Sequence, residues 1–345
     1  MEVTMGDGGT RAGDRPRTVD IHCHVSNPAC EALVREQFQA RFEPFVFYGG
    51  EESNAYNREH FGEIVPKLTD PELRLRDMDR MGIDVQAISV APPQYFYWTD
   101  PGLGTRLARM INDRLAEIVD AYPTRFVGLG TLPMQDVDRA LDELRYIEEL
   151  GFAGIEICTN VNGLDFDHPR FRPFFAACQE RELLVLVHPN GFTDGERLMD
   201  YYLINVMGMP LDSAVFLSRL VFGGVLERFP DLKMCVVHGG GYIPSYPARL
   251  DHAYEVRPEC RKHISRPPST YLAQLYYDTV LYEPVGLGHL VERWGSDHVL
   301  LGTDYPYDMG ESDPVGLIQS VPSLSKEDRA RILGGNAARL LRLDG

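Results

Sequence analysis

Eight short apolar segments, separated by segments with helical periodicity, are the feature that most constrains the fold of this 345-residue chain. Most of them are rich in β-branched residues and have too little polar alternation for a strand with one face in water. That composition is typical of strands in a buried parallel sheet. The segments are residues 18–24, 85–91, 125–131, 154–158, 183–188, 233–238, 275–280 and 298–304.

Helical patterns fill the spaces between these segments. Segment 70–82 opens with Asp-Pro and closes on a glycine, 103–122 carries apolar residues at helical spacing, and 136–151 ends on a glycine. Eight alternations of strand and helix predict an α/β fold of the (β/α)8, or TIM-barrel, type, with a doubly wound sheet as the alternative. Further helices are expected at 170–181, 212–228, 284–294 and 325–341.

Two segments, 25–69 and 189–211, are too long for ordinary barrel connections. The first follows strand 1 and is rich in aromatic residues, so we expect an insertion that forms an ordered lid over the barrel mouth. Its aromatic residues include Phe42, Phe45, Phe47 and Tyr48.

Nothing in the sequence divides the chain into two domains. We find no internal repeat, low-complexity tract or Pro/Ser-rich linker, so residues 18–345 are predicted to form a single barrel. Residues 1–17 have no apolar core of the kind found in signal peptides, and we expect them to be a disordered tail.

Composition narrows the function classes. A formal net charge of −17 argues against a nucleic-acid partner, which needs a basic face, and an anionic substrate would need arginines placed locally. The six cysteines form no CxxC motif and are expected to be reduced thiols. No apolar run approaches transmembrane length, so we expect a soluble, cytoplasmic protein without a membrane partner.

The first strand carries the motif His-Cys-His at residues 22–24. Side chains at alternate positions of a strand lie on one face, so His22 and His24 reach the same volume, which suits a metal ion. The alternative is an exposed polar face that happens to contain histidine. Cys23 points to the opposite face and is expected to pack in the core rather than to bind metal.

Three more residues of this chemistry fall at strand ends. His188 ends strand 5, His238 ends strand 6, and Asp304 follows strand 8. Because barrel active sites form at the carboxyl ends of the strands, these residues converge on one mouth with His22 and His24. Imidazoles and a carboxylate suit a divalent transition metal with one position open for water or substrate.

His238 is followed by three glycines, as in the oxyanion motif of lipases. The chain has no GxSxG motif, so a serine hydrolase is excluded, and we expect His238 to act as an acid/base beside the metal rather than as a ligand. A helix starting at these glycines would direct N–H groups toward an anion. Downstream, Arg249 and Arg257 are candidates for bidentate binding of a substrate carboxylate, with exposed surface arginines as the alternative.

With these residues in place, the chain resembles the amidohydrolase superfamily from about Val19 to Leu343, and is most similar to its aminocarboxymuconate-semialdehyde decarboxylase family. The stretches that carry the resemblance are DIHCH, YPTRFVGLGTLPMQ, HGGGYIP and LGTDYPYDMGE. The resemblance implies a (β/α)8 barrel with one divalent metal, usually zinc with manganese as the alternative. It assigns the metal ligands as His22, His24, His188 and Asp304.

The resemblance also assigns roles around the metal. His238 matches the family's catalytic histidine, and Arg249 matches an arginine that binds the substrate carboxylate across a homodimer interface. Strand 4 lacks the carboxylated lysine that bridges two metals in other members, which favours a mononuclear site. Asn190 replaces a tryptophan of the family after the third ligand and is a candidate substrate contact.

These observations predict a metal-dependent, non-oxidative decarboxylase of a small unsaturated or aromatic carboxylic acid, such as aminocarboxymuconate semialdehyde or a carboxylated phenol. His238 and Asp304 are its expected catalytic residues. A metal-dependent hydrolase or hydratase is the alternative, and a barrel with a structural zinc is the non-enzymatic one. The sequence leaves open whether hydroxide adds first or the carbon is protonated directly.

Overall fold

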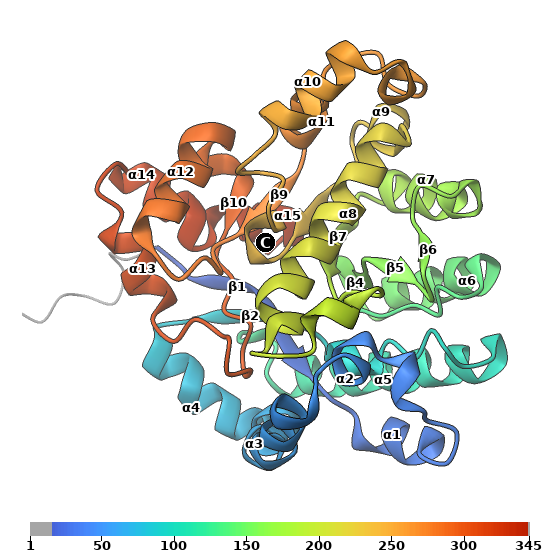
Figure 1. Cartoon of the computed structure of the whole chain (residues 1–345). Helices are drawn as coiled ribbons and strands as arrows, with labels where there is room; N and C mark the ends of the chain where they lie inside the picture. Colours follow the sequence, from blue (N-terminus) through green and yellow to red (C-terminus); the bar gives the residue numbers. More distant parts are fainter. Residues whose placement is uncertain (1–15, 344–345) are drawn as a thin grey trace, which may run out of the picture.

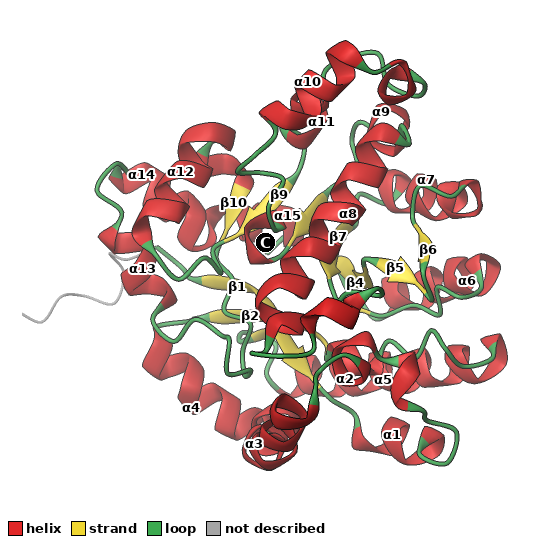
Figure 2. Cartoon of the chain, viewed as in Figure 1, coloured by secondary structure: helices red, strands yellow, loops and turns green. Residues whose placement is uncertain are grey.

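The computed structural model describes residues 16–343, and all eight predicted strands lie there in a single sheet (Figure 1). Each strand pairs in parallel with the next strand in the sheet order, and helices surround the strands (Figure 2). In this order the strands are β1 (Val19–Val25), β2 (Val85–Val90), β3 (Phe126–Gly130), β4 (Gly154–Cys158), β7 (Leu184–His188), β8 (Met234–Val236), β9 (Tyr276–Asp278) and β10 (Val299–Leu300).

Backbone hydrogen bonds between β1 and the segment that begins at β10 close the ring of strands. Ile21 N donates to Leu301 O at 2.9 Å, and Asp304 N donates to His22 O at 2.8 Å. A further parallel bridge joins Cys23 to Tyr305. The fold is therefore the predicted TIM barrel and not a doubly wound sheet.

The helices between the strands lie close to the predicted ranges. In α4, Asp70 accepts hydrogen bonds from the amides of Glu72 and Leu73, Pro71 occupies the first turn, and Gly82 ends the helix in a left-handed conformation. These helices are α4 (Pro71–Met81), α5 (Pro101–Ala121), α6 (Val137–Glu149), α7 (Arg172–Glu180) and α12 (Pro284–Trp294). The segment predicted as one helix at 212–228 forms two, α8 (Met209–Phe222) and α9 (Val225–Arg228), and α13 (Pro314–Ser320), after β10, was not predicted.

The segment predicted as one helix at 325–341 differs. It consists of α14 (Lys326–Ala330), a π-helical turn at Arg331–Gly335 and α15 (Asn336–Leu341). Gly334 faces the carbonyl oxygen of Arg17 so closely that a Cβ atom there would lie 2.0 Å from it. The widened turn thus accommodates the chain that leads into β1.

A bulge in β1 reverses which residues face the barrel interior. Val19 and Ile21 belong to an apolar cluster that includes residues of α15, which Figure 1 shows at the centre of the ring of strands. The pairing register of β1 with β2 shifts between Asp20 and Cys23. Cys23 belongs to a second apolar cluster, which contains residues of the surrounding helices. Cys23 is therefore a core residue, as expected.

The long segments 25–69 and 189–211 are largely helical, which the sequence did not indicate. The first contains α1 (Pro28–Val34), a 3₁₀ turn at Ala40–Phe42, α2 (Pro44–Phe47) and α3 (Glu51–Thr69). Only Ile64 and Leu68 are buried along α3, so its amphipathic pattern is weak. The second contains short turns at Gly195–Leu198 and Ile204–Gly208 before α8.

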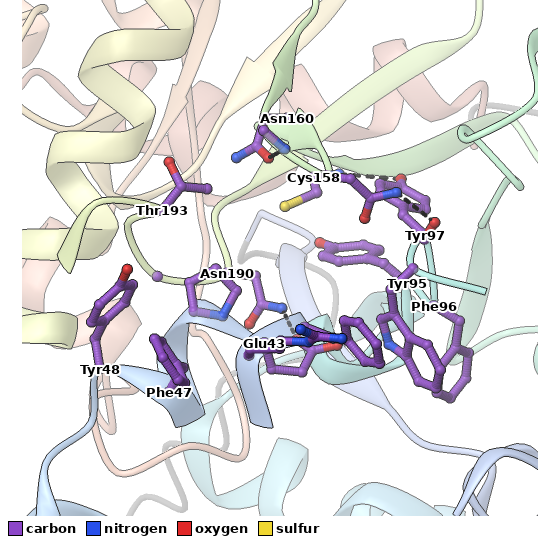
Figure 3. Close-up of a pocket in the computed structure, with 17 residues that line it drawn as sticks. Glu43, Phe47, Tyr48, Tyr95, Phe96, Tyr97, Cys158, Asn160, Asn190 and Thr193 are labelled. Carbon is purple, nitrogen blue, oxygen red and sulfur yellow. Dashed lines mark hydrogen bonds between the residues drawn. The ribbon is translucent and has the colours of Figure 1, made fainter. Parts of the chain in front are cut away.

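Glu43, Phe47 and Tyr48 of the first segment line a cavity together with residues that follow β2, β4 and β7 (Figure 3). Residues 40–48 are called the lid segment below, and their closing over the mouth remains a prediction. Of the expected disordered tail, residues 1–17, residues 1–15 lie outside the described part of the chain.

One helical segment, Ile204–Phe222, has the length and composition of a membrane span, contrary to the expectation that no run comes close. About half of it, 56%, is buried within the molecule, where Phe216, Leu217 and Leu220 of α8 join the core. Core helices of soluble proteins meet the same criterion, so this segment is weak evidence for a membrane.

Asp20, which is fully buried, joins the first strand to the last. Its Oδ1 accepts hydrogen bonds from the amides of His22 and Thr303, both at 3.1 Å. Its Oδ2 accepts from Gln86 Nε2 at 2.9 Å and from Thr303 Oγ1 at 2.7 Å. Burial raises the pKa of Asp20 to about 6, although these hydrogen bonds lower it.

We predict that Thr303→Val lowers the free energy of unfolding by about 1.5–3 kcal/mol, because the buried carboxylate of Asp20 loses a charge-assisted hydrogen bond. Urea denaturation in the presence of a chelator measures this loss without a contribution from bound metal. Thr105→Val is the control, since Thr105 Oγ1 only bonds Pro101 O within its own helix. An unfolding free energy of Thr303→Val equal to that of the control would contradict the prediction.

Candidate metal centre

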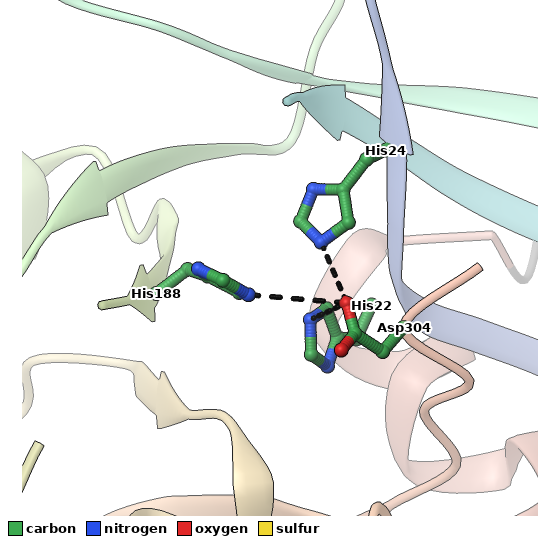
Figure 4. Close-up of side chains that lie close together, drawn as sticks. All are labelled: His22, His24, His188 and Asp304. Atoms are coloured by element: carbon green, nitrogen blue, oxygen red, sulfur yellow. Dashed lines mark hydrogen bonds and ion pairs between the residues drawn. The ribbon is translucent and has the colours of Figure 1, made fainter. Parts of the chain in front are cut away.

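Four side chains from distant parts of the sequence converge at the carboxyl ends of the strands (Figure 4). His22 and His24 come from β1, His188 ends β7, and Asp304 follows β10. One potential ligand atom from each lies within 4.8 Å of the others, and all four residues are buried. The cluster includes none of the histidines at positions 60, 168, 252, 263, 289 and 298.

The spacing of the cluster fits a metal ion. Oδ1 of Asp304 lies 3.1 Å from Nε2 of His24, 3.3 Å from Nε2 of His22 and 3.9 Å from Nε2 of His188. Ligands at about 2.0–2.2 Å from a tetrahedral ion lie roughly 3.3 Å from one another. Nε2 of His22 and of His188 are buried and have no hydrogen-bond partner among residues 16–343.

Each of the three imidazoles is held through its other nitrogen. Nδ1 of His22 lies 2.6 Å from Asp278 Oδ2, and Nδ1 of His24 lies 3.1 Å from the carbonyl oxygen of Val90. Nδ1 of His188 lies 2.6 Å from the carbonyl oxygen of Pro189. An oxygen acceptor at Nδ1 places the proton there, so Nε2 presents its lone pair to the centre.

The electrostatics of the cluster suit a bound cation. Burial alone lowers the pKa of His22, but the carboxylates of Asp304 and Asp278 outweigh it and raise the pKa to about 10. Burial alone raises the pKa of Asp304, but the surrounding imidazoles bring it well below its usual range. Burial and neighbouring imidazoles lower the pKa of His188, which keeps it neutral. The carboxylates thus stabilise positive charge, while His188 remains available as a neutral ligand.

His238 lies beside this cluster in a different environment. Its Nε2 is 3.5 Å from Oδ2 of Asp304. The other three imidazoles contact the second oxygen of that carboxylate, Oδ1. Its side chain is 15% exposed, and its Nδ1 has no hydrogen-bond partner among the described residues. Within residues 16–343 no oxygen holds Nδ1 of His238, unlike Nδ1 of the three other imidazoles, which fits an acid/base residue better than a metal ligand.

The glycines after His238 do not start a helix, contrary to the expectation. His238–Gly240 form a single 3₁₀ turn, and the following helix, α10 (Ala248–Val256), begins eight residues later. The three glycines have φ values of 59°, 76° and 67°, which are incompatible with a right-handed helix. Gly239 N donates to Asp278 Oδ1 at 2.8 Å, so this amide serves the carboxylate that holds His22.

Three residues of the site were missed from the sequence. Asp278 ends β9, and its position at a strand end was the available signal. Glu156 lies on β4 and accepts a hydrogen bond from Tyr95 at 2.5 Å, while its Oε2 is buried without a partner among the described residues. The ring of Tyr307 lies 5.3 Å from the ring of His24, measured between centroids. The Tyr307 hydroxyl is also buried and has no hydrogen-bond partner within residues 16–343.

The structure does not bring all the predicted substrate-binding residues to the metal cluster. Arg249 is exposed on α10, at the outer edge of the molecule in Figure 1, and has no hydrogen bond or ion pair among residues 16–343. Arg257 is on the surface, where its Nε donates to Glu259 at 2.7 Å. Asn190 follows His188 and donates from Nδ2 to Glu43 of the lid segment. The structure therefore brings only Asn190 close to the metal cluster.

Comparison with known proteins places this architecture in a family. Residues 19–343 match the family model described as Amidohydrolase. The chain is 37% identical to 2-amino-3-carboxymuconate-6-semialdehyde decarboxylase of Dictyostelium discoideum, over 82% of this chain and 80% of that protein.

Solved structures agree. The 5-carboxyvanillate decarboxylase of Sphingomonas paucimobilis superimposes with a TM-score of 0.84 and 28% identity, covering 95% of this chain and 99% of that one. A dihydroxybenzoic acid decarboxylase of Polaromonas, with bound manganese and the inhibitor 2-nitroresorcinol, gives a TM-score of 0.82 and 25% identity, covering 96% and 98%.

We predict one divalent metal ion per chain in the wild-type protein and about 10- to 100-fold weaker metal binding in Asp278→Asn, because His22 loses the carboxylate that orients it. Competition with a chelator measures the affinity, and elemental analysis gives the stoichiometry. Asp79→Asn is the control, since Asp79 is exposed and pairs only with Arg125 at 2.7 Å. Unchanged affinity in Asp278→Asn, or two ions per chain, would show that the cluster is wrongly assigned.

Proposed function

The chain belongs to the amidohydrolase family, and we propose that it removes CO₂ from an unsaturated or aromatic carboxylic acid at a metal held by His22, His24, His188 and Asp304. It is a metal-dependent, non-oxidative carboxy-lyase, as are the relatives described above. The observation that carries the proposal is the convergence of three oriented imidazoles and one carboxylate, with His238 on the far oxygen of that carboxylate.

The donor set suits either of two ions. Three imidazole nitrogens and a carboxylate oxygen are common ligands of Zn²⁺, which the sequence favoured, and they also bind Mn²⁺. Manganese is the ion named for the Polaromonas relative, so we propose a divalent ion that is either Zn²⁺ or Mn²⁺.

The proposed chemistry uses the two oxygens of Asp304. A divalent ion held by His22, His24, His188 and Asp304 would supply Lewis-acid chemistry that stabilises negative charge on the substrate. His238, whose Nε2 lies 3.5 Å from Asp304 Oδ2, and that carboxylate form the path by which a proton from solvent reaches the carbon that CO₂ leaves. A carbon–hydrogen bond replaces the carbon–carboxyl bond, and the reaction consumes no oxidant or reductant.

The candidate substrates are aminocarboxymuconate semialdehyde and carboxylated phenols. Hydrolysis at the same cluster, one alternative from the sequence, is not favoured, because the relatives described above are decarboxylases. Hydration at the cluster remains the alternative. A structural zinc gives no reason for an acid/base histidine beside the ligands. We further propose a cytoplasmic homodimer without nucleic-acid or membrane partners.

We predict that the purified protein releases CO₂ from at least one member of a panel of carboxylated muconates and phenols. His238→Ala should reduce turnover at least about 100-fold, the usual contribution of an acid/base group, while its metal content stays normal. Gas-phase CO₂ detection and elemental analysis provide the two measurements, with His252→Ala, an exposed histidine, as the control. Loss of metal in His238→Ala would mean that His238 is a ligand.

Arg249 is predicted to bind the substrate carboxylate of a neighbouring subunit, because it is exposed, unpaired among the described residues and eleven residues beyond His238. Losing a charge-assisted contact costs about 1.5–3 kcal/mol, so Arg249→Ala should raise KM roughly 10- to 150-fold. Steady-state kinetics check this, with Arg145→Ala, an exposed arginine of α6, as the control.

Mixing Arg249→Ala with His238→Ala protein should restore part of the activity, because a hybrid dimer contains one site with both residues intact. No recovery, after subunit exchange has been demonstrated with tagged chains, would place Arg249 in its own subunit's site or outside any site.

A further inference from the structure

A cavity of about 500 Å³ lies beside the metal cluster, within the usual size range of small-molecule sites. Its walls come from the lid segment and from the loops after β2, β4 and β7 (Figure 3), namely residues 41–48, 95–98, 158–163 and 190–193. We call it the distal pocket, because none of the four metal-cluster residues lines it.

The distal pocket adjoins the cluster on the side of His188. Cys158, which lines the pocket, pairs with His188 across β4 and β7. Tyr95 also lines the pocket, and its hydroxyl lies 3.5 Å from the carbonyl oxygen of His188. Asn190, two residues after His188 in the sequence, is a further lining residue. A substrate whose reacting carboxyl lies at the cluster therefore extends its far side into this pocket.

The walls of the pocket favour a planar ring. Phe42 and Trp98 stack with ring centroids 4.8 Å apart and an angle of 10° between the planes. Tyr95 and Tyr97 form a second stack with centroids 5.5 Å apart. Flat aromatic surfaces that line a cavity bind an aromatic ring by stacking and by burial of apolar area.

The polar groups inside the pocket are a carboxyl group and neutral donors. Glu43 is only 5% exposed and accepts a hydrogen bond from Asn190 Nδ2 (Figure 3). Nε1 of Trp98 is buried and interacts with the carboxyl group of Glu43, whose pKa it lowers. Arg41 is the one cationic residue that lines the pocket, and it is exposed, with its guanidinium 5.4 Å from the Phe42 ring centre.

A second substrate carboxylate would be poorly accommodated here. It would lose water beside the carboxyl group of Glu43, and no buried cation lies in the pocket to replace that hydration. An uncharged hydroxyl or amide can instead exchange a hydrogen bond with Glu43 without giving up the hydration of a charge.

We propose that the distal pocket binds the far side of the substrate and is selective for an aromatic ring with an uncharged hydrogen-bonding substituent over a ring with a second carboxylate. The reason is that its described lining residues include the buried carboxyl group of Glu43 and no buried cation. The proposal rests on the proposed function, since it assumes that the reacting carboxyl lies at the metal cluster. It narrows the substrate to a monocarboxylated phenol, rather than a dicarboxylate such as aminocarboxymuconate semialdehyde.

The protonation of Glu43 agrees with this selectivity. Burial raises the pKa of Glu43 to about 8, despite the hydrogen bond from Asn190. At neutral pH the carboxyl therefore keeps its proton and can donate to a neutral acceptor. Above about pH 8 it becomes an anion and repels a second anion more strongly.

The test uses the metal-loaded protein and two unreactive probes of nearly equal size. One is 2-nitroresorcinol with a carboxylate para to the nitro group, and the other has a carboxamide at that position. Calorimetry near pH 7 should show the carboxamide binding at least about tenfold more tightly than the carboxylate. This comparison needs no variant, so it does not depend on how a substitution affects folding.

Glu43→Gln then tests the role of the side chain itself, because it removes the ionisable group and keeps the shape. The ratio of the carboxylate probe's Kd in wild type to its Kd in the variant should be near one near pH 6. Near pH 9 the ratio should rise to about ten, since only the wild type becomes anionic there. The probe's own titration is common to both proteins and cancels in the ratio.

Three results would overturn the proposal. The carboxylate probe could bind as tightly as the carboxamide, the ratio could stay flat with pH, or Arg41→Ala could weaken the carboxylate probe alone. The third result would mean that Arg41 turns inward and pairs with a second carboxylate. CO₂ release from dicarboxylates alone would also overturn the selectivity while leaving the decarboxylase function intact, whereas no CO₂ from any substrate would reject the function itself.

Discussion

The hydrogen bonds to Asp20 are the constraint on which the rest of the site depends. They join β1 to the segment after β10, so the two ends of the barrel meet where the metal cluster lies. His24 and Asp304 are 280 residues apart in sequence, yet their side-chain atoms lie 3.1 Å apart. The carboxylate of Asp20 binds the amides of both His22 and Thr303. The interaction that closes the barrel therefore also positions the metal-cluster residues on either side of the closure.

This dependence explains why so many charged and polar groups can be buried at the strand ends. Asp278 bonds His22 and the amide of Gly239, while Asp304 is surrounded by imidazoles. Buried carboxylates are costly unless they are compensated, and here histidines compensate both of them. A divalent cation would extend the same compensation, because Nε2 of His22 and Nε2 of His188 have no hydrogen-bond partner within residues 16–343.

The strands and the ligand cluster could be predicted from sequence because both follow from short-range rules. Buried parallel strands read as apolar runs, and their carboxyl ends share one mouth, so the sequence alone places His188 and Asp304 there. The inward turn of Ile21 could not be predicted, since a bulge, and not simple alternation, sets the face of His22. The helices of segment 25–69 were also missed, because α3 buries only Ile64 and Leu68 and carries little periodicity.

Substrate choice depends on residues for which no such rule exists. The metal cluster is built on strand ends, whereas the distal pocket is built on the lid segment and on loops, where sequence pattern does not fix geometry. Glu43 is 147 residues from Asn190, and only the folded chain places the two in contact. A barrel of this kind can therefore keep its metal chemistry unchanged while the lid segment and the loops select between substrates. In this chain the lid residue Glu43 is acidic and buried, so the pocket that it faces favours an uncharged substituent.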